Sequence, residues 1–169
     1  MELWDAYDKN FNKIDGVTLV RGEKIPEGMY HLVADVIVRH TDGEYLLMQR
    51  DPGKHYGGMW EATAGGSAIK GETAYECAVR ELREETGIAS RELVEVGRVE
   101  DGKQTLYVEF LCVTDFDKGG VILQEGETSD YKWVGREELL AMNASELVTK
   151  RMQSFIDELA GKQITPTSR

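Results

Sequence analysis

The sequence has little cysteine, little basic charge and no long apolar run. Its 169 residues include two cysteines, Cys77 and Cys112, which are too few for the disulfide framework of a small secreted domain. We expect both to be reduced core thiols, as in a cytoplasmic protein. No apolar run approaches the ~18 residues of a membrane span. The N-terminus lacks a basic region followed by an apolar core, so we expect no secretory signal.

Basic residues are outnumbered by acidic ones. Lys and Arg total 20 against 31 Asp and Glu, which gives a formal net charge of −11. Proteins that bind nucleic-acid polymers present a basic face, so we expect neither a nucleic-acid polymer nor a membrane as partner. The same charge would repel a phosphate-bearing substrate unless a bound cation neutralised it.

The length suits one domain with one sizeable core. We expect a single domain over residues 1–169, whose first 30 residues form an arm rich in polar and turn residues. Apolar runs between turn signals predict strands, and longer periodic segments predict helices. The strands are expected at 31–39, 44–50, 59–64, 92–100, 104–114 and 131–134, the helices at about 73–86, 135–142 and 145–159, and a frayed tail from Gly161. This pattern predicts an α/β fold with a mixed sheet and helices on both faces.

The predicted helix over 73–86 carries an unusual set of acids. Glu81, Glu84 and Glu85 stand at i, i+3 and i+4, so they project from one helical face. Like charges at that spacing repel, so helix stability does not favour the arrangement. A hard divalent cation does, because Mg²⁺ binds carboxylate oxygens and keeps waters for a phosphate substrate. The alternative is an ordinary solvated acidic face.

The residues around these acids fit a ligand site. Gly65 and Gly66 allow the backbone before the helix to approach a ligand closely. Arg80 lies next to the acids and has a planar fork suited to holding a carboxylate in place. Gly87 is a signal for the end of the helix.

The spacing over residues 66–88 resembles the Nudix box, and every fixed position of that family pattern is matched. The matching residues are Gly66, Glu72, Arg80, Glu81, Leu82, Glu84, Glu85, Gly87 and Ile88. The resemblance implies an α/β/α sandwich with the box helix beside the sheet. The wider match runs from about His31 to Leu140.

The resemblance also implies a chemistry. Nudix enzymes generally use Mg²⁺ (or Mn²⁺) to hydrolyse the pyrophosphate bond of a nucleoside diphosphate linked to another moiety, or of a related diphosphate. Glu81, Glu84 and Glu85 match the metal-ligand positions of the family. The cation neutralises the phosphate oxygens and lowers the pKa of a water. Glu84 or Glu85 is a candidate to accept the proton of that water.

In this family the general base varies and sometimes comes from a loop outside the box. Glu127, before the predicted strand 131–134, is a second catalytic candidate, whereas we interpret Glu125 as an exposed loop acid. Arg50 ends a predicted strand and could bind a phosphate bidentately. An edge-strand charge with no ligand is an equal alternative for Arg50.

A second resemblance gives a rival function. Residues 2–8, 21–28 and 30–32 are similar to the start of isopentenyl-diphosphate isomerase and its Nudix relatives. That isomerase needs a cysteine in the strand before the box, where this chain has Ala64, and a histidine shortly after it, which is also missing. We therefore interpret the chain as a member of the isomerase-like subgroup that performs hydrolysis.

A non-catalytic nucleotide sensor is a third hypothesis, because some Nudix folds lose acids and only bind. No acid of this box is lost. The substrate is expected to be a small-molecule diphosphate, and nucleotides, nucleotide sugars, coenzymes and prenyl diphosphates all stay open. A homodimer that pairs through the N-terminal arm also stays open.

Overall fold

Strand β3 (His31–His40) is the axis of the main sheet in the computed structural model, which describes residues 1–148 and 151–159. It pairs in parallel with β8 (Thr105–Thr114) and antiparallel with β6 (Thr63–Ser67). Within the described residues the sheet has seven strands in all. The others are β4 (Tyr45–Arg50), β5 (Trp60–Glu61), β7 (Leu93–Glu100) and β9 (Thr128–Val134). The sheet is mixed, which confirms the predicted fold class.

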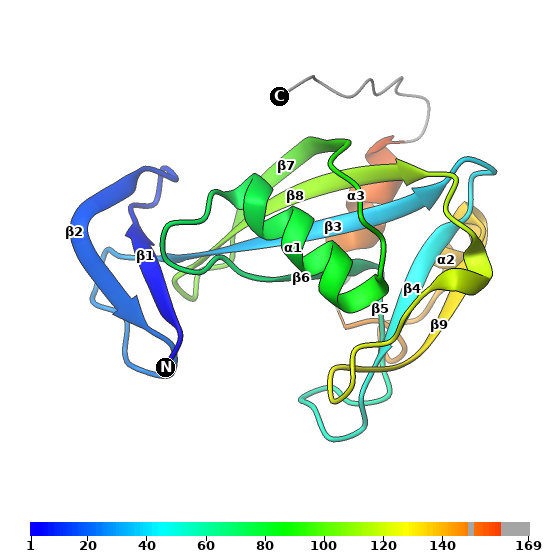
Figure 1. Cartoon of the computed structure of the whole chain (residues 1–169), viewed down its shortest axis with the longest axis horizontal. Helices are drawn as coiled ribbons and strands as arrows, with labels where there is room; N and C mark the ends of the chain where they lie inside the picture. The colour runs from blue at the N-terminus through cyan, green and yellow to red at the C-terminus, as the bar shows by residue number, and fades with distance from the viewer. Residues whose placement is uncertain (149–150, 160–169) are drawn as a thin grey trace.

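Helices cover both faces of the sheet, because successive side chains of β3 point to opposite sides. Helix α1 (Ala74–Thr86) packs its buried Ala78 and Leu82 into the same cluster as Val36. Helices α2 (Arg136–Ala141) and α3 (Arg151–Leu159) share the opposite cluster with Ile37. Figure 1 shows α1 in front of the strands and the other two helices behind them.

The N-terminal arm differs from the prediction. It contains a two-stranded hairpin of β1 (Leu3–Tyr7) and β2 (Lys13–Val20), with its own small core of Trp4, Ala6 and Leu19. Half of the β2 residues are exposed and the register shifts within β1. These features weaken the apolar alternation by which a strand is recognised in a sequence.

The hairpin is fixed to residues 65–73, which lead into α1 and contain three glycines, Gly65, Gly66 and Gly71. We call these residues the glycine-rich loop. The carboxylate of Asp5, buried in β1, accepts a hydrogen bond from the backbone N–H of Gly71 at 2.8 Å. The backbone N–H of Lys70 donates to the carbonyl of Leu3 at 2.8 Å, and its ammonium donates to the Thr18 hydroxyl at 2.7 Å. These bonds place both strands of the hairpin beside the glycine-rich loop, at the left of Figure 1.

Three other boundaries differ. The predicted strand 59–64 is two strands, β5 and β6, and β6 continues to Ser67. Strand β9 begins at Thr128, three residues before the predicted start. The predicted helix 145–159 is wrong over 145–148, where Leu147 instead forms a bridge with Trp60. The tail from Gly161 lies outside the described residues.

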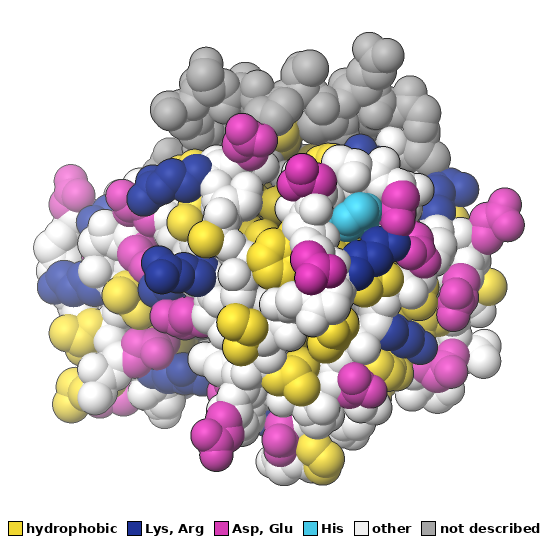
Figure 2. Space-filling model, turned by 45° about the vertical axis from the view of Figure 1, so that its right-hand side comes forward, with side chains coloured by type: hydrophobic (Ala, Val, Ile, Leu, Met, Phe, Trp, Pro, Cys, Tyr) yellow, Lys and Arg dark blue, Asp and Glu magenta, His cyan; other side chains and the backbone are white. Residues whose placement is uncertain are grey.

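Charged side chains of both signs are interspersed on the coloured part of the face in Figure 2, and the basic ones form no continuous surface there. Within the described part of the chain, no helix is long and apolar enough to cross a membrane.

Gly65 provides a test of this packing. A Cβ on Gly65 would lie 2.4 Å from the backbone oxygen of Ala34 and 2.3 Å from Asp35 Oδ1 on the neighbouring β3. We therefore expect Gly65→Ala to lower the free energy of unfolding by about 1–3 kcal/mol through overpacking, measured by chemical denaturation. Gly119→Ala is the control, because the nearest atom to its Cβ is 3.7 Å away. Equal losses in the two variants would contradict the packing described here.

Candidate active site

Capping residues next to helix α1 determine where it begins and ends. The Thr73 hydroxyl accepts from the backbone N–H of Glu76 at 3.1 Å, and the Glu76 carboxylate accepts from the backbone N–H of Thr73 at 2.8 Å. This reciprocal cap fixes the first turn. Gly87, with φ of 80°, ends the helix in the left-handed region. The predicted helix is confirmed, and Glu81, Glu84 and Glu85 therefore lie on one face of it.

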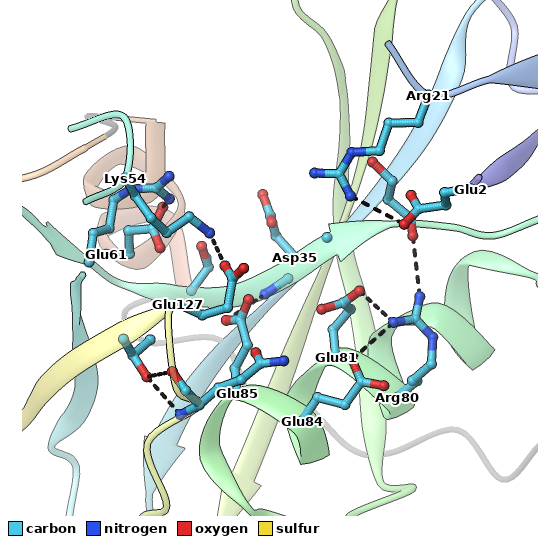
Figure 3. Close-up of a pocket in the computed structure, with 17 residues that line it drawn as sticks. Glu2, Arg21, Asp35, Lys54, Glu61, Arg80, Glu81, Glu84, Glu85 and Glu127 are labelled. Atoms are coloured by element: carbon cyan, nitrogen blue, oxygen red, sulfur yellow. Dashed lines mark hydrogen bonds and ion pairs between the residues drawn. The ribbon is translucent and has the colours of Figure 1, made fainter. Parts of the chain in front are cut away.

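A cavity of about 400 Å³ lies over this helical face. Every site residue predicted from the sequence lines it: Arg50, Glu81, Glu84, Glu85 and Glu127. They come from three parts of the chain, namely the end of β4, helix α1 and the segment before β9 (Figure 3). Glu125 is exposed and is not among the lining residues.

Arg80 is the centre of the ionic contacts on the helix. Its guanidinium donates to both carboxylate oxygens of Glu72, at 2.7 and 3.0 Å, and to the backbone oxygen of Ser67 at 3.2 Å. It also donates to Glu81 at 2.6 Å and to Glu84 at 3.2 Å. Glu72 precedes the helix, so Arg80 ties the glycine-rich loop to two of the three acids.

Glu85 is held differently. One of its oxygens accepts from the backbone N–H of Gly65 at 3.3 Å. Burial raises the pKa of Glu85 well above its usual range, and the nearby Glu81 and Glu61 carboxylates raise it further. Burial also raises the pKa of Glu81, although Arg80 opposes the shift. Seven acidic and four basic side chains line the cavity, so its acids outnumber the cations that could neutralise them.

This donor set fits a hard divalent cation. All three side chains offer carboxylate oxygens, which Mg²⁺ prefers. A Cβ on Gly66 would lie 2.5 Å from Glu81 Oε1, so glycine leaves room for the carboxylate there. Among the described residues, no three potential ligands converge into a ready-made metal site. Glu81 and Glu84 instead accept hydrogen bonds from the guanidinium of Arg80.

Cations line the side of the cavity opposite α1. Arg50 donates to Glu61 Oε1 at 2.7 Å and to the backbone oxygen of His55 at 2.7 Å. Lys54 forms an ion pair with Glu127. The sequence interpretation missed Lys54, and no local signal marks it, because its place beside Glu127 depends on a contact between segments 73 residues apart.

A buried charge network lies at the back of the cavity. Asp35 on β3 and Glu109 on β8 are direct neighbours in the parallel register, and Arg151 of α3 binds them at 3.2 and 3.0 Å. Burial raises the pKa of Asp35 to about 7 and that of Glu109 to about 8, against the attraction of Arg151. The sequence interpretation missed this network. The signal was an acid inside each of two apolar strands, which is rare without a partner.

Comparison with known proteins identifies the family. The family model described as NUDIX domain matches residues 29–159. The chain belongs to the Nudix family.

Two relatives illustrate its place there. An uncharacterized Nudix hydrolase of Listeria monocytogenes is 33% identical over 86% of this chain and 86% of its own length. The isopentenyl-diphosphate Delta-isomerase of Photobacterium profundum is 30% identical over 80% of this chain and 85% of its own length. Both resemblances noted in the sequence are thus confirmed.

A solved structure supports the fold. DR0079 of Deinococcus radiodurans superposes with a TM-score of 0.72 at 20% identity, over 93% of this chain and 98% of that one. The two proteins therefore share a fold over most of this chain.

The buried acid pair predicts a pH dependence of stability. Free Asp and Glu lose their protons near pH 4, whereas burial raises the pKa of Asp35 to about 7 and of Glu109 to about 8. The folded state thus binds more protons between these limits. The contribution of the pair to stability is fully present below about pH 4 and is lost as the pH rises through about 8.

Glu109→Gln mimics the protonated acid and leaves Asp35 and Arg151 as a simple ion pair. We expect its free energy of unfolding, relative to wild type, to rise steadily between pH 5 and pH 8 in urea titrations. Glu92→Gln, at an exposed position, should show no such trend. A difference between Glu109→Gln and wild type that does not change with pH would contradict the raised pKa of Glu109.

Proposed function

We propose that this protein is a metal-dependent hydrolase that splits the pyrophosphate bond of a nucleoside diphosphate linked to another moiety, or of a related small-molecule diphosphate. One observation carries the proposal. The three box carboxylates line a single cavity together with the cations Arg50 and Lys54. Such a site can hold a cation on one side and phosphate oxygens on the other. The two buried free cysteines support a cytoplasmic location.

Glu81, Glu84 and Glu85 would hold Mg²⁺ or Mn²⁺. When bound, the ion supplies positive charge against the diphosphate and favours ionisation of the attacking water. Arg80 keeps Glu81 and Glu84 oriented through its contacts with Glu72 and the loop. In the substrate complex, Arg50 and Lys54 bind phosphate oxygens and place the scissile bond over the acids.

Glu84 and Glu127 are the candidates for accepting the proton of the water. The Glu84 side chain is 46% exposed, so it can reach a water in the cavity. Glu127 is paired with Lys54 before substrate binds. A phosphate that binds Lys54 draws the ammonium away from Glu127, and the freed carboxylate becomes a stronger base. Binding of the substrate would thus activate Glu127 as the general base.

The cysteines argue against isomerase chemistry. Ala64 is buried in β6 at the position where that reaction needs a thiol. Burial raises the pKa of Cys77 to about 12, and its thiol lies 3.4 Å from the backbone oxygen of Gly66. Neither Cys77 nor Cys112 is among the residues that line the cavity. Hydrolysis needs only a cation, water and a base, for which candidates are present.

The cation site is tested by chelation and by charge removal. We expect excess chelator to abolish hydrolysis of a responsive diphosphate, and Mg²⁺ or Mn²⁺ to restore it. Glu84→Gln and Glu85→Gln keep side-chain shape but remove charge, so kcat should fall by a factor on the order of 10² or more. The matched control is Glu125→Gln, outside the cavity, which should keep wild-type kcat. If both box variants turned over like wild type, the acids would not serve catalysis and the sensor hypothesis would gain.

The rival reaction is tested with isopentenyl diphosphate and Mg²⁺. Without a thiol beside the substrate carbon, we expect no dimethylallyl diphosphate to form. At least one nucleoside or sugar diphosphate compound should be cleaved, and ¹⁸O from labelled water should enter a phosphate product. Dimethylallyl diphosphate without hydrolysis of any member of a broad panel would overturn the proposed function.

A further inference from the structure

The N-terminal hairpin brings two charged residues to the cavity. Glu2, just before β1, and Arg21, just after β2, both line it. Figure 3 shows them on the opposite side of the box acids from Lys54. The cavity therefore has a cationic group at each end and carboxylates between them.

Arg21 is the least engaged of the three arginines that line the cavity. Arg80 and Arg50 direct their guanidinium groups at several protein oxygens. Arg21 makes one side-chain contact among the described residues, from Nη1 to Glu2 Oε2 at 3.2 Å, and its side chain is 66% exposed. Most of its N–H donors are thus available to a ligand.

The hairpin does not need this ion pair for its own stability. The backbone N–H of Arg21 already donates to the carbonyl of Glu2 at 3.0 Å, and Leu3 is in register with Val20 beside it. An exposed ion pair adds little to such a structure. The guanidinium is therefore available for another role.

The position of Arg21 is nevertheless well fixed. The other oxygen of Glu2 accepts from Trp4 Nε1 at 2.7 Å. Trp4 is buried and stacks on His31 with ring centroids 4.3 Å apart. Asp5 also accepts from the Gly71 N–H, and Lys70 donates to Thr18. Together these interactions hold the hairpin, and with it Arg21, at the cavity.

We propose that Arg21 is a specificity-determining residue that binds a further phosphate of the substrate, one beyond the two phosphates whose bond is split. This inference rests on the proposed hydrolase function. A guanidinium is always charged, and its planar fork matches phosphate oxygens bidentately. In the absence of substrate Glu2 occupies one donor, and the phosphate competes with Glu2 for it. The further phosphate is either the terminal group of a polyphosphate or a group on a ribose hydroxyl.

The test compares substrates that differ by one phosphate. One pair is a nucleoside diphosphate and the corresponding triphosphate, and the other is ADP-ribose with and without a 2′-phosphate. Wild type should prefer the more phosphorylated member of one pair, which identifies where the further phosphate is attached. Arg21→Ala should reduce that preference on the order of tenfold through KM, with kcat nearly unchanged. Arg21→Lys should restore part of it, because Lys keeps the charge but not the fork.

Two more variants test whether the preference depends on the charge of Arg21 in the cavity. Glu2→Gln removes the competing charge, so it should increase the preference for the further phosphate. Lys24→Ala removes one positive charge from the same exposed segment but not from the cavity lining, and it should leave the preference unchanged. Equal loss for both members of a pair in Arg21→Ala, or the same loss in Lys24→Ala, would overturn the inference.

Binding is measured separately from turnover. Analogues of the same pairs with a methylene group in place of the bridging oxygen cannot be split there, and their binding is followed by calorimetry with Mg²⁺ present. If the analogues show the Arg21-dependent preference but no compound is hydrolysed, the proposed function fails and the role of Arg21 in binding stands. If wild type shows no preference within either analogue pair, the role of Arg21 is wrong.

Discussion

Arg80 connects the parts of the molecule on which the site depends. Its guanidinium binds Glu72 and the Ser67 carbonyl from the glycine-rich loop, and Glu81 and Glu84 from helix α1. Without it, three acids on one helical face would repel each other with little compensation. With it, two of them are oriented and the loop is held against the helix. Glu85 has no such partner among the described residues and instead rests on the Gly65 backbone, which leaves the charge excess that a divalent cation would balance.

The site is built from both sides of the sheet. Helix α1 supplies the acids from one face, and Arg151 of α3 binds Asp35 and Glu109 on the other face. Gly65 joins the two layers, since it contacts Asp35 on β3 and donates its N–H to Glu85. The hairpin closes a third side through Asp5 and Lys70. The box carboxylates are thus surrounded by three parts of the chain: helix α1, the network of Arg151 with Asp35 and Glu109, and the hairpin.

The sequence predicted the parts of this site that local signals determine. The start of the helix near Thr73, its end at Gly87 and the spacing of the acids are local features of one segment, and the helix was predicted correctly. Arg21, Lys54, Asp35 and Glu109 were missed because their positions depend on contacts between distant segments. Asp35 and Glu109 become neighbours only through the parallel register of β3 and β8. The hairpin was missed because half of β2 is exposed and the register shifts within β1, so the apolar periodicity of both strands is weak.

The central claim is that the box carboxylates form a divalent-cation site, and direct binding of Mn²⁺ tests it without any substrate. Mn²⁺ is added stepwise to samples of wild type, Glu85→Gln and Glu125→Gln, and the free ion is measured by electron paramagnetic resonance. The account predicts saturable binding to wild type and to Glu125→Gln, and binding weakened on the order of tenfold or more in Glu85→Gln, because a ligand charge is lost. Equal binding by all three proteins, or no saturable binding to wild type, would contradict it.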